Sequence, residues 1–509
     1  MEIYFRGNNL IPENEWIEFI DSLKASQKAT RDELKNQILN AVKKRIPKKR
    51  FGIFFSGGVD SSLIALICKQ AGADFICYTV GLENAADIEA GKKAAESIGV
   101  KLRYKVFSLE EAEKIIKETT KIVGPDVMKV GVGSVVIAAV KLAKQDNIDT
   151  FFSGLGSEEL FAGYERHQKA KDINNECWLG LKSMYKRDLE RDVEVAKALR
   201  INILTPFLDK DLIKAAMQIP GEEKLSRENN KLILRKIAEE LGLPNEIAWR
   251  KKIAAQYGSK FDRAILRLSR RSKFRFKKDY LKQFYPLGAL VSSGKDSIYA
   301  MHLMMKQYNV KCMMTMKSQN PVSYMFHTPA VEMVRLQAES IGLPLIEHQT
   351  KGEKEKELAD LKTLMQKAKE KYNIQGVVTG ALYSSYQKER VEKVAESLCL
   401  KVFSPLWHVN QEQYMREIIK EGFRFILTKV ACEGLDKSWL NRQITERDVD
   451  KLAELNRKIG INVAGEGGEF ESLMVAGPIF KKKIKITDSE IDEESRIIAT
   501  LKVKKAELA

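Results

Sequence analysis

Apolar residues in the stretch 50–165 gather in short runs that alternate with amphipathic segments. The runs FGIFF, FICYTVG and DTFFSG have the length of buried strands. Between them, SSLIALICKQ, AADIEAGKKAAESIG and a stretch around 134–145 carry the apolar spacing of helices. This order of elements predicts an α/β domain with a parallel sheet and crossover helices.

The same alternation restarts after Pro286, where GALVSS, DSIYAMHLMMKQ and KCMMTM begin a second α/β pattern. Further strands are predicted in GVVTGA, LKVFSPL and FRFILTKVA, and residues 481–509 indicate a closing hairpin or edge strands. Residues 15–45 and 170–257 have mainly helical spacing. We therefore predict two domains, residues 1–258 and 285–509.

Basic residues dominate the segment between the two predicted domains, residues 259–284, which includes RRSKFRFKK at 270–278. We interpret it as a linker. It is either a solvated interdomain helix or a segment that contacts RNA or phosphate.

A Ser/Gly-rich loop follows the first strand of each domain. The first lies in FGIFFSGGVDSS at 51–62 and the second in LGALVSSGKDS at 287–297. Each loop leads into a helix, so its backbone N–H groups would lie at a helix N-terminus, where an anionic phosphate is stabilised. Neither loop is a Walker A motif, because the terminal Gly-Lys-Ser/Thr is missing.

Composition narrows the class of protein. The chain has 509 residues, of which 44% are hydrophobic and 30% charged, and its apolar runs are too short to span a bilayer. The segment MEIYFRGNN predicts no secretory signal, and six scattered cysteines without a CxxC pair suit a reducing cytosol. We therefore expect a cytoplasmic protein that does not enter a membrane.

The formal net charge is +17. This charge favours a polyanionic partner such as nucleotide, RNA or a ribosome-associated substrate, and proximity to tRNA or the ribosome is one expectation. The alternative is a lysine-rich surface of the kind found in some archaeal or thermophilic proteins.

The SGGxDS pattern of the first loop resembles the pyrophosphate-binding (PP) loop of the ATP pyrophosphatases, which implies an adenine-nucleotide α-hydrolase-like (HUP) fold for both domains. Downstream of it lie SGLGSEELFAGY at 153–164, TPFLDKDLI at 205–213 and KLILRKIAEELGLP at 231–244. In this order, over residues 30–260, the segments resemble the synthetase domain of asparagine and β-lactam synthetases.

That resemblance implies ATP and Mg²⁺ as cofactors and a carboxylate that is adenylated before an amine displaces AMP. It implies that Asp60 and Glu158 hold Mg²⁺ and that Lys231 is catalytic, because it would neutralise charge on the phosphates. The residues implied to bind ATP or pyrophosphate in this domain are Ser56, Gly57, Gly58, Asp60, Ser61, Gly154 and Gly156.

Two features depart from the synthetase pattern. Leu155 stands where the family has Glu or Tyr, and it can neither accept nor donate a proton. Glu158 stands where the family has Asp. In addition, the chain begins Met1-Glu2 without the amidohydrolase cysteine of glutamine-dependent relatives, so we expect free ammonia, or ammonia from a partner. The alternative for this domain is nucleotide binding without amide chemistry.

The second loop is followed by GALYSSYQKERVEKV at 380–394, FSPLW at 403–407 and GEGGEFESLMVAGPIF at 465–480. Over residues 285–482 these segments resemble the diphthine–ammonia ligase family. That resemblance implies amidation of diphthine on translation elongation factor 2 with ATP and ammonium. CEGLDKSWLNRQI at 432–444 fits the family loosely, with Asn441 where Gly is expected.

The second resemblance also implies roles for individual residues. Ser292, Ser293, Gly294, Asp296 and Ser297 would hold the pyrophosphate, with Ser293 tolerated if its position does not need a positive φ. Lys295 would be a mobile catalytic cation, and Asp296 would bind Mg²⁺. The implied sites for the acyl substrate or ammonium are Tyr386, Gln387, Arg390, Glu433, Gly434 and Gly467, together with the carboxylates Glu466, Glu469 and Glu471.

A cluster of carboxylates can bind ammonium and remove its proton, which an ammonium-fed amide ligase needs. A strand over FESLMV would place Glu469 and Glu471 on one face, and the alternative is a solvated glycine turn at 465–471. The leading hypothesis is thus an ATP-dependent amide ligase acting on diphthine. The alternatives are an ammonia-dependent asparagine synthetase-like enzyme, a PP-loop tRNA-modifying enzyme and a non-catalytic nucleotide-binding scaffold.

Overall fold

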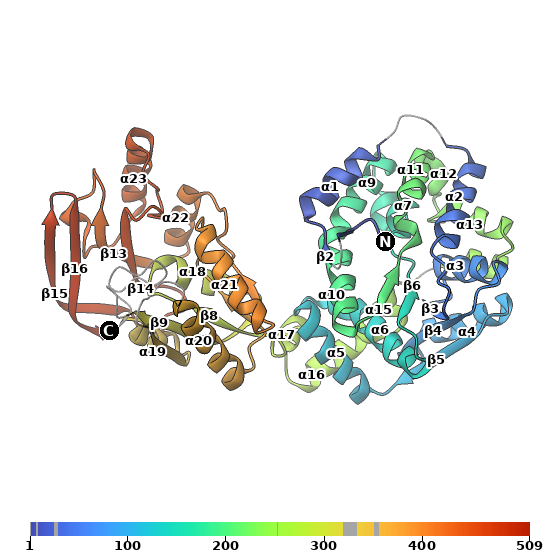
Figure 1. The fold of residues 1–509 in the computed structure, drawn as a ribbon, viewed down its shortest axis with the longest axis horizontal. Coiled ribbons are helices and arrows are strands. Elements are labelled where there is room, and N and C mark those ends of the chain that lie inside the picture. Colours follow the sequence, from blue (N-terminus) through green and yellow to red (C-terminus); the bar gives the residue numbers. More distant parts are fainter. Residues whose placement is uncertain (1, 7–8, 25–28, 252, 319–332, 351–355) are drawn as a thin grey trace. The chain divides into compact units, whose positions relative to one another are not determined.

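The computed structural model describes residues 2–6, 9–24, 29–251, 253–318, 333–350 and 356–509. The chain divides into two compact units, Met1–Phe284 and Tyr285–Ala509 (Figure 1). Each unit has its own hydrophobic cores. Each unit is described by itself.

The first unit is built on a five-stranded parallel sheet in the order β5-β4-β3-β6-β7. Its strands are β3 (Phe51–Phe54), β4 (Phe75–Leu82), β5 (Leu102–Phe107), β6 (Thr150–Phe152) and β7 (Asn202–Leu204). A short antiparallel pair, β1 (Phe5–Arg6) and β2 (Asn9–Leu10), precedes the sheet in sequence.

Helices cover both faces of this sheet. Successive side chains of a strand point to opposite faces, so each strand contributes to the packing on both sides. On β4, Cys77 belongs to the core that holds α2, α3, α11 and α13, whereas Tyr78 belongs to the core that holds α5, α6, α10 and α16. Burial on both faces explains why the strands have nearly continuous apolar sequences. The helices, with their bounds, are α1 (Glu13–Ser22), α2 (Arg31–Lys43), α3 (Val59–Gln70), α4 (Ala86–Ile98), α5 (Leu109–Val123), α6 (Val127–Ala143), α7 (Ser157–Leu160), α8 (Glu165–Gln168), α9 (Ile173–Met184), α10 (Glu190–Leu199), α11 (Lys210–Gln218), α12 (Gly221–Lys224), α13 (Leu232–Glu240), α14 (Asn245–Ala248), α15 (Ala255–Gly258), α16 (Phe261–Arg271) and α17 (Lys277–Lys282).

The second unit repeats the parallel sheet in the order β10-β9-β8-β11-β12. Its strands are β8 (Pro286–Leu290), β9 (Asn309–Ser318), β10 (Leu345–Thr350), β11 (Gly376–Val378) and β12 (Lys401–Phe403). Its helices are α18 (Lys295–Met305), α19 (Met333–Ile341), α20 (Lys356–Tyr372), α21 (Ser385–Ser397), α22 (Gln411–Lys420) and α23 (Glu446–Ile459). The predicted α/β class with two parallel sheets is confirmed.

A second sheet distinguishes this unit from the first. It is antiparallel, in the order β14-β13-β16-β15, and comprises β13 (Arg424–Ala431), β14 (Phe470–Ala476), β15 (Ile484–Ser495) and β16 (Ile498–Leu508). FRFILTKVA was predicted as a strand, but the strand lies in this separate sheet. β15 and β16 form the predicted closing hairpin.

Residues 259–284 do not form the linker that their charge indicated. They fold as α16 and α17 within the first unit, where Phe261, Ile265, Leu268 and Tyr280 are buried in its core. The basic residues occupy the outer face of an amphipathic helix, so charge concealed the apolar stripe that anchors it. The stretch 170–257 is mainly helical as predicted, apart from the short edge strand β7.

Within the described residues, no single helix has both the length and the apolar character to cross a membrane. The helical segments Leu109–Val123 and Val127–Asp146 together reach the length and apolar composition of a membrane span, but a bend of 118° separates them.

Candidate active sites

The two Ser/Gly-rich loops have the same internal hydrogen bonds. In the first unit the Ser56 N–H donates to Ser61 Oγ (3.3 Å), and Ser61 Oγ donates to the Gly58 carbonyl (3.3 Å). In the second unit the corresponding distances are 3.2 Å and 3.2 Å, with Ser292, Ser297 and Gly294 in the same roles. Gly58 and Gly294 are the N-caps of α3 and α18. The predicted helix-terminal loops are therefore present in both units.

The second residue of each loop is left-handed. Gly57 has a φ of 65° and Ser293 has a φ of 71°. The sequence interpretation allowed serine here only if the position did not need a positive φ, and that condition is not met. Left-handed backbone costs an L-residue about 1–2 kcal/mol. Ser293 is also fully buried, and its hydroxyl has no hydrogen-bond partner among the described residues.

Both loops lie at the point where the strand order reverses, between β3 and β6 in one sheet and between β8 and β11 in the other. Open α/β sheets bind ligands at this place, outside the carboxyl ends of the strands. The loop that follows the neighbouring strand approaches closely in both units. A Cβ on Gly154 would lie 3.1 Å from Asp60 Cβ, and one on Gly380 would lie 2.5 Å from the Ser297 nitrogen.

A buried lysine organises the first site. Lys231 is 2% exposed, and its ammonium contacts Asp60 (2.8 Å), Glu158 (2.9 Å) and Ser157 Oγ (2.9 Å). Lys231 precedes α13 with a φ of 59°, another left-handed non-glycine residue, and such backbone is found at functional sites. Asp60 and Glu158 come from α3 and α7, so the fold brings together the three charged residues that the sequence proposed.

The donor set of the first site suits a hard cation. Asp60 and Glu158 already share one positive charge, the Lys231 ammonium, and Mg²⁺ prefers carboxylate oxygens together with phosphate and water. Two protein carboxylates are enough for a metal that is completed by a nucleotide. No group of three or more metal-ligating side chains occurs in the part of the chain that the structure describes.

Local structure and packing fix two residues around this site, Gly156 and Leu155. Gly156 is the N-cap of α7, with a φ of 97°. Leu155 donates its N–H to Ser153 Oγ (3.3 Å), and its partly buried side chain packs on the hydrophobic core. Leucine at this position therefore has a packing role and offers no proton-transfer group.

The second site also has a buried lysine, but from another position in the chain. Lys295 is the first residue of α18 and is 2% exposed, so it is not the mobile cation that was expected. Its ammonium contacts the Asp296 carboxylate (2.9 Å) and donates to the Ala464 carbonyl (2.6 Å). The rings of Tyr414 and Phe470 lie within 6 Å of it. Through these contacts Lys295 connects the PP loop with the glycine-rich segment that begins at Gly465.

Glu466, a carboxylate of that segment, has an altered proton affinity. Burial, followed by the negative charge of Asp296, raises its pKa to about 7, although Lys295 and a backbone hydrogen bond from Tyr383 oppose the rise. The segment 465–471 is thus not a solvated turn around this side chain. A carboxylate with this pKa exchanges protons near neutral pH.

The other two predicted carboxylates differ from Glu466. Glu469 is 9% exposed and accepts hydrogen bonds from the Asn462 N–H (2.7 Å), the Asn462 side chain (3.0 Å) and the Gly467 N–H (2.8 Å). It precedes β14 and shapes the turn. Glu471 lies within β14, paired with Lys429 on β13.

The proposed substrate-binding residues lie on two elements. Tyr386, Gln387 and Arg390 occupy the first turn and a half of α21, where the Arg390 guanidinium lies 3.5 Å from the centre of the Tyr386 ring and the Gln387 N–H donates to Ser384 Oγ (3.3 Å). Glu433 is exposed just after β13, beside Gly434.

Two contacts at the sites were missed from the sequence. The buried Tyr414 on α22 donates its hydroxyl to Asp296 (2.7 Å), and burial raises its pKa well above the ordinary value. Arg250 donates to the Ser56 carbonyl (3.0 Å). Tyr414 lies in an ordinary amphipathic helix without a motif, so the sequence carried no signal for it.

Comparison with known proteins separates the two units in the same way. The family model for asparagine synthase matches residues 33–173 and 166–274. The models for the diphthamide synthase N-terminal and C-terminal domains match residues 287–402 and 410–508.

The chain is 36% identical over 224 residues to the diphthine–ammonia ligase of Mus musculus, covering 40% of this chain and 84% of that protein. It is 32% identical over 299 residues to a putative glutamine-hydrolysing asparagine synthetase of Methanocaldococcus jannaschii, covering 51% of this chain and 54%, about half, of that protein's length. Among solved structures, the NMN synthetase of Francisella tularensis aligns with a TM-score of 0.27 and 11% identity, over 50% of this chain and 92% of that one.

Proposed function

The chain belongs to the diphthine–ammonia ligase family and carries an asparagine synthase-like domain ahead of its ligase unit, and from this we propose that the second unit is an ATP-dependent amide ligase. The proposed acyl substrate is diphthine on elongation factor 2, and the proposed amine is ammonia.

The reaction would have two steps. First, the diphthine carboxylate oxygen bonds to the α-phosphorus of ATP, and the bond from that phosphorus to the bridging oxygen breaks, which releases pyrophosphate. Next, the ammonia nitrogen bonds to the acyl carbon, and the bond from that carbon to the AMP oxygen breaks. Ammonium first loses one proton to a carboxylate of the protein, which gives ammonia. The nitrogen loses a second proton, to the departing AMP phosphate or to water, as the amide forms.

The PP loop of the second unit would bind the phosphates. The N–H groups at the start of α18 and the Lys295 ammonium offer positive charge to pyrophosphate as it leaves. Asp296, which Tyr414 orients, would hold Mg²⁺ in this unit, as Asp60 and Glu158 would in the first. When bound, Mg²⁺ would offset the charge of the phosphates.

The observation that carries this proposal is Glu466. Its carboxylate faces the charges of Asp296 and Lys295, and its pKa of about 7 matches that of a base that accepts a proton at neutral pH. The Tyr383 N–H, from the loop that leads into α21, bonds to the same carboxylate. Glu466 therefore lies between the phosphate loop and the helix proposed to bind the substrate.

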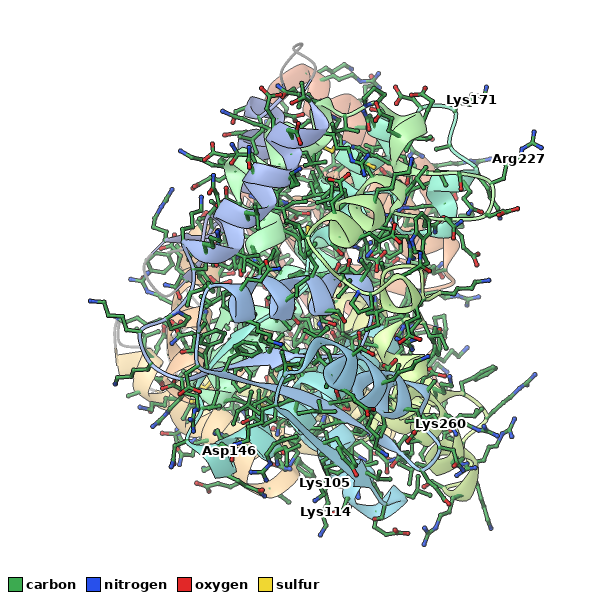
Figure 2. All side chains as sticks on the ribbon, turned by 90° about the vertical axis from the view of Figure 1, so that its right-hand side faces the viewer. Lys105, Lys114, Asp146, Lys171, Arg227 and Lys260 are labelled. Atoms are coloured by element: carbon green, nitrogen blue, oxygen red, sulfur yellow. The ribbon has the colours of Figure 1, made fainter. Side chains whose placement is uncertain are left out.

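The charge of the chain is compatible with this partner. The formal net charge is +17, and basic side chains such as Lys171 and Arg227 project from the first unit (Figure 2). We propose docking to an elongation factor close to tRNA or the ribosome, and hence a cytoplasmic location.

The first unit is proposed to bind ATP in the manner of asparagine synthetases. The Lys231, Asp60 and Glu158 cluster supports this, since the lysine is placed to offset charge on the phosphates. Amide formation on a free amino acid such as aspartate is its candidate activity. Leu155 favours instead a nucleotide-binding role without proton transfer.

The buried cysteines argue against tRNA thiolation as the function of this chain. Burial raises the pKa of the Cys68 and Cys312 thiols to about 12, whereas persulfide chemistry needs a thiolate. Neither residue belongs to the contacts of either loop. A variant with all six cysteines replaced is expected to keep the amidation activity.

Pyrophosphate release from ATP, with ammonium and diphthine-bearing elongation factor 2, tests the proposal. We expect Asp296→Asn and Glu466→Gln to lower the rate of the full-length protein by roughly 100-fold or more. Asp60→Asn is expected to leave it unchanged. Glu412→Gln is the control, since Glu412 is a half-buried carboxylate on α22 that pairs with Arg416.

Equal losses in Asp60→Asn and Asp296→Asn would contradict the assignment of amidation to the second unit. Release of pyrophosphate with free aspartate, lost only in Asp60→Asn, would make the asparagine-forming reaction the principal activity.

A further inference from the structure

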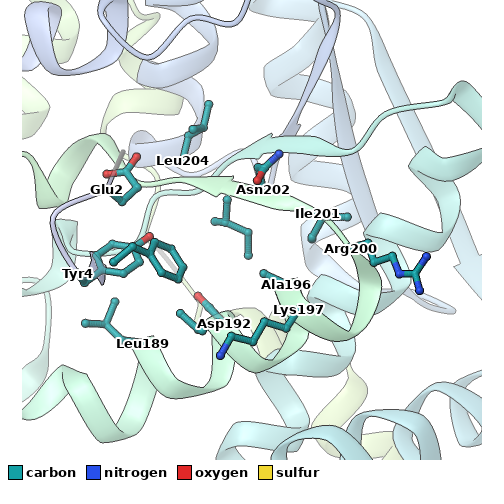
Figure 3. Close-up of a pocket in the computed structure, with 13 residues that line it drawn as sticks. Glu2, Tyr4, Leu189, Asp192, Ala196, Lys197, Arg200, Ile201, Asn202 and Leu204 are labelled. Carbon is teal, nitrogen blue, oxygen red and sulfur yellow. The ribbon is translucent and has the colours of Figure 1, made fainter. Parts of the chain in front are cut away.

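A cavity of about 530 Å³ opens in the first unit, outside the PP-loop site (Figure 3). It lies between the N-terminal residues Tyr4 and Phe5, helix α10 and the edge strand β7. Leu189, Val193 and Ile203 make much of its wall apolar. The volume falls in the range of small-molecule sites, which are apolar with few polar groups.

A carboxylate lies at the wall of this cavity. Asp192 is 8% exposed, and within the described part of the chain it accepts hydrogen bonds from Arg191 alone, at 2.7 Å from Nε to Oδ1. Figure 3 shows its carboxylate directed toward the space beside Tyr4, whereas the guanidinium of Arg200 points away from it. Lys197 donates to Asn9 (3.3 Å). Asp192 is therefore the carboxylate directed into the cavity, whose lining also includes Lys197 and Arg200.

Asp192 also ends a buried row of ion pairs with an excess of negative charge. The row runs through the π-helical turn Tyr185–Leu189 into α10, and π-helical turns are frequent at functional sites. Its carboxylates are Glu159, Asp188 and Asp192, and its guanidiniums are Arg187 and Arg191. With one carboxylate more than guanidiniums, the row lacks a cation. Burial raises the pKa of Asp192 and of Glu159, although Arg191 and Arg187 oppose the rise.

The second carboxylate near the cavity is already neutralised. Glu2 accepts hydrogen bonds from Nε (2.8 Å) and Nη2 (3.0 Å) of the Arg45 guanidinium and from the Thr205 N–H (3.1 Å). Asp192 is thus the group with acceptor capacity for a ligand. The rings of Tyr4 and Phe5, whose centres are 4.9 Å apart, add aromatic faces that attract a cation.

We propose that this cavity is a binding site for an organic ammonium ion with an apolar body, whose ammonium pairs with Asp192. The apolar wall would bury the body of the ligand, and the carboxylate with the aromatic pair would select the charge. The site is separate from the proposed amide ligase reaction and does not depend on it.

Binding of three probes of similar shape to the full-length protein tests this inference. We expect 2-phenylethylammonium to bind saturably, 2-phenylethanol to bind at least about tenfold more weakly, and 3-phenylpropionate not to bind, as measured by ligand-observed NMR and calorimetry. Equal binding of the three, or no saturable binding of the amine, would overturn the proposal.

Two variants locate the site. Asp192→Asn should abolish the preference for the amine over the alcohol. Because that buried substitution can destabilise the unit, Ala196→Phe is the second variant, in which the added ring fills the cavity from α10 and should weaken amine binding at least tenfold. Ala198→Phe, exposed on the same helix and outside the cavity, should bind like the wild type. Unchanged amine binding in Ala196→Phe would place the ligand elsewhere.

Discussion

The two units use one sheet order and one loop geometry but different residues to hold the loop aspartate. In the first unit the lysine comes from 171 residues away, where Lys231 reaches Asp60. In the second unit it is the neighbour of the aspartate, Lys295 beside Asp296. Val59 occupies in the first loop the place that Lys295 has in the second. Both loops therefore have a lysine ammonium beside the aspartate, but the lysine comes from a different position in the chain in each unit.

The two sites also differ in the environment of their second carboxylate, Glu158 in the first unit and Glu466 in the second. In the first unit Glu158 is held by the Lys231 ammonium at 2.9 Å. In the second, Glu466 has a pKa of about 7 and no lysine within salt-bridge distance among the described residues. The first arrangement suits charge neutralisation, whereas the second suits proton transfer. This contrast favours the second unit as the place where the proposed deprotonation of ammonium would occur.

Replacement of a buried site lysine is expected to give the largest change in the free energy of unfolding among the substitutions considered. Lys231→Met removes the ammonium that contacts the buried Asp60 and the partly buried Glu158, and it should lower the free energy of unfolding of the first unit by roughly 3–5 kcal/mol. Lys295→Met should cost its unit less, about 1–3 kcal/mol, because Tyr414 still donates to Asp296. Urea unfolding followed by hydrogen-exchange mass spectrometry resolves the two units.

Adding Val59→Lys to Lys231→Met sharpens the comparison. The new lysine takes the place that Lys295 has in the second loop, so it should restore part of the lost stability. Val59→Met in the same background is the uncharged control. If both double variants behave alike, the ammonium position is not interchangeable.

The first loop should not tolerate serine at its left-handed position. A Cβ on Gly57 would lie 2.4 Å from the Ala90 carbonyl oxygen, so Gly57→Ser is expected to destabilise the first unit by roughly 2–3 kcal/mol. Gly72→Ser is the matched control, since Gly72 has a similar φ of 71° and open space around it. Equal losses at Gly57 and Gly72 would show that contact with Ala90 adds nothing to backbone strain.

The pH dependence of amidation should reveal Glu466. A base must be deprotonated, so at fixed ammonium concentration the rate should rise about tenfold per pH unit and level off above pH 7. In Glu466→Gln the rate should be lower and should follow free ammonia, which continues to rise above pH 7. A wild-type profile that also continues to rise would argue against Glu466 as the base.

Relief of strain in the second loop is the smallest effect. Ser293→Gly should raise the free energy of unfolding of the second unit by about 1 kcal/mol, because glycine accepts the left-handed backbone and no hydroxyl is buried unpaired. Ser293→Ala, which keeps the strain, separates the two contributions. A loss of stability in Ser293→Gly would show that the serine has a favourable contact.

Strand and helix order followed from the sequence because burial on both faces leaves a strong apolar pattern. The α/β class is confirmed by the two parallel sheets, and the family assignment by the matching family models and relatives. The segment 259–284 was wrongly interpreted as a linker. Its helix α16 has only eleven residues, so the basic residues dominate its sequence and obscure the apolar stripe of Phe261, Ile265 and Leu268. Three-residue strands such as β7 carry too little periodicity to be detected.

The sequence determined the residue types of the sites and their place after particular strands, because these depend on local pattern. The family resemblance assigned Lys231, Asp60 and Glu158 to one site, and tertiary structure decided how the charges pair. It paired Lys231 with Asp60 and Glu158, placed Tyr414 on Asp296, and buried Lys295 where a mobile side chain was expected. It also assigned Glu469 to a turn and left Glu466 to titrate near pH 7. Proton affinity and ion pairing depend on burial and on distances between segments far apart in the chain, which local sequence does not encode.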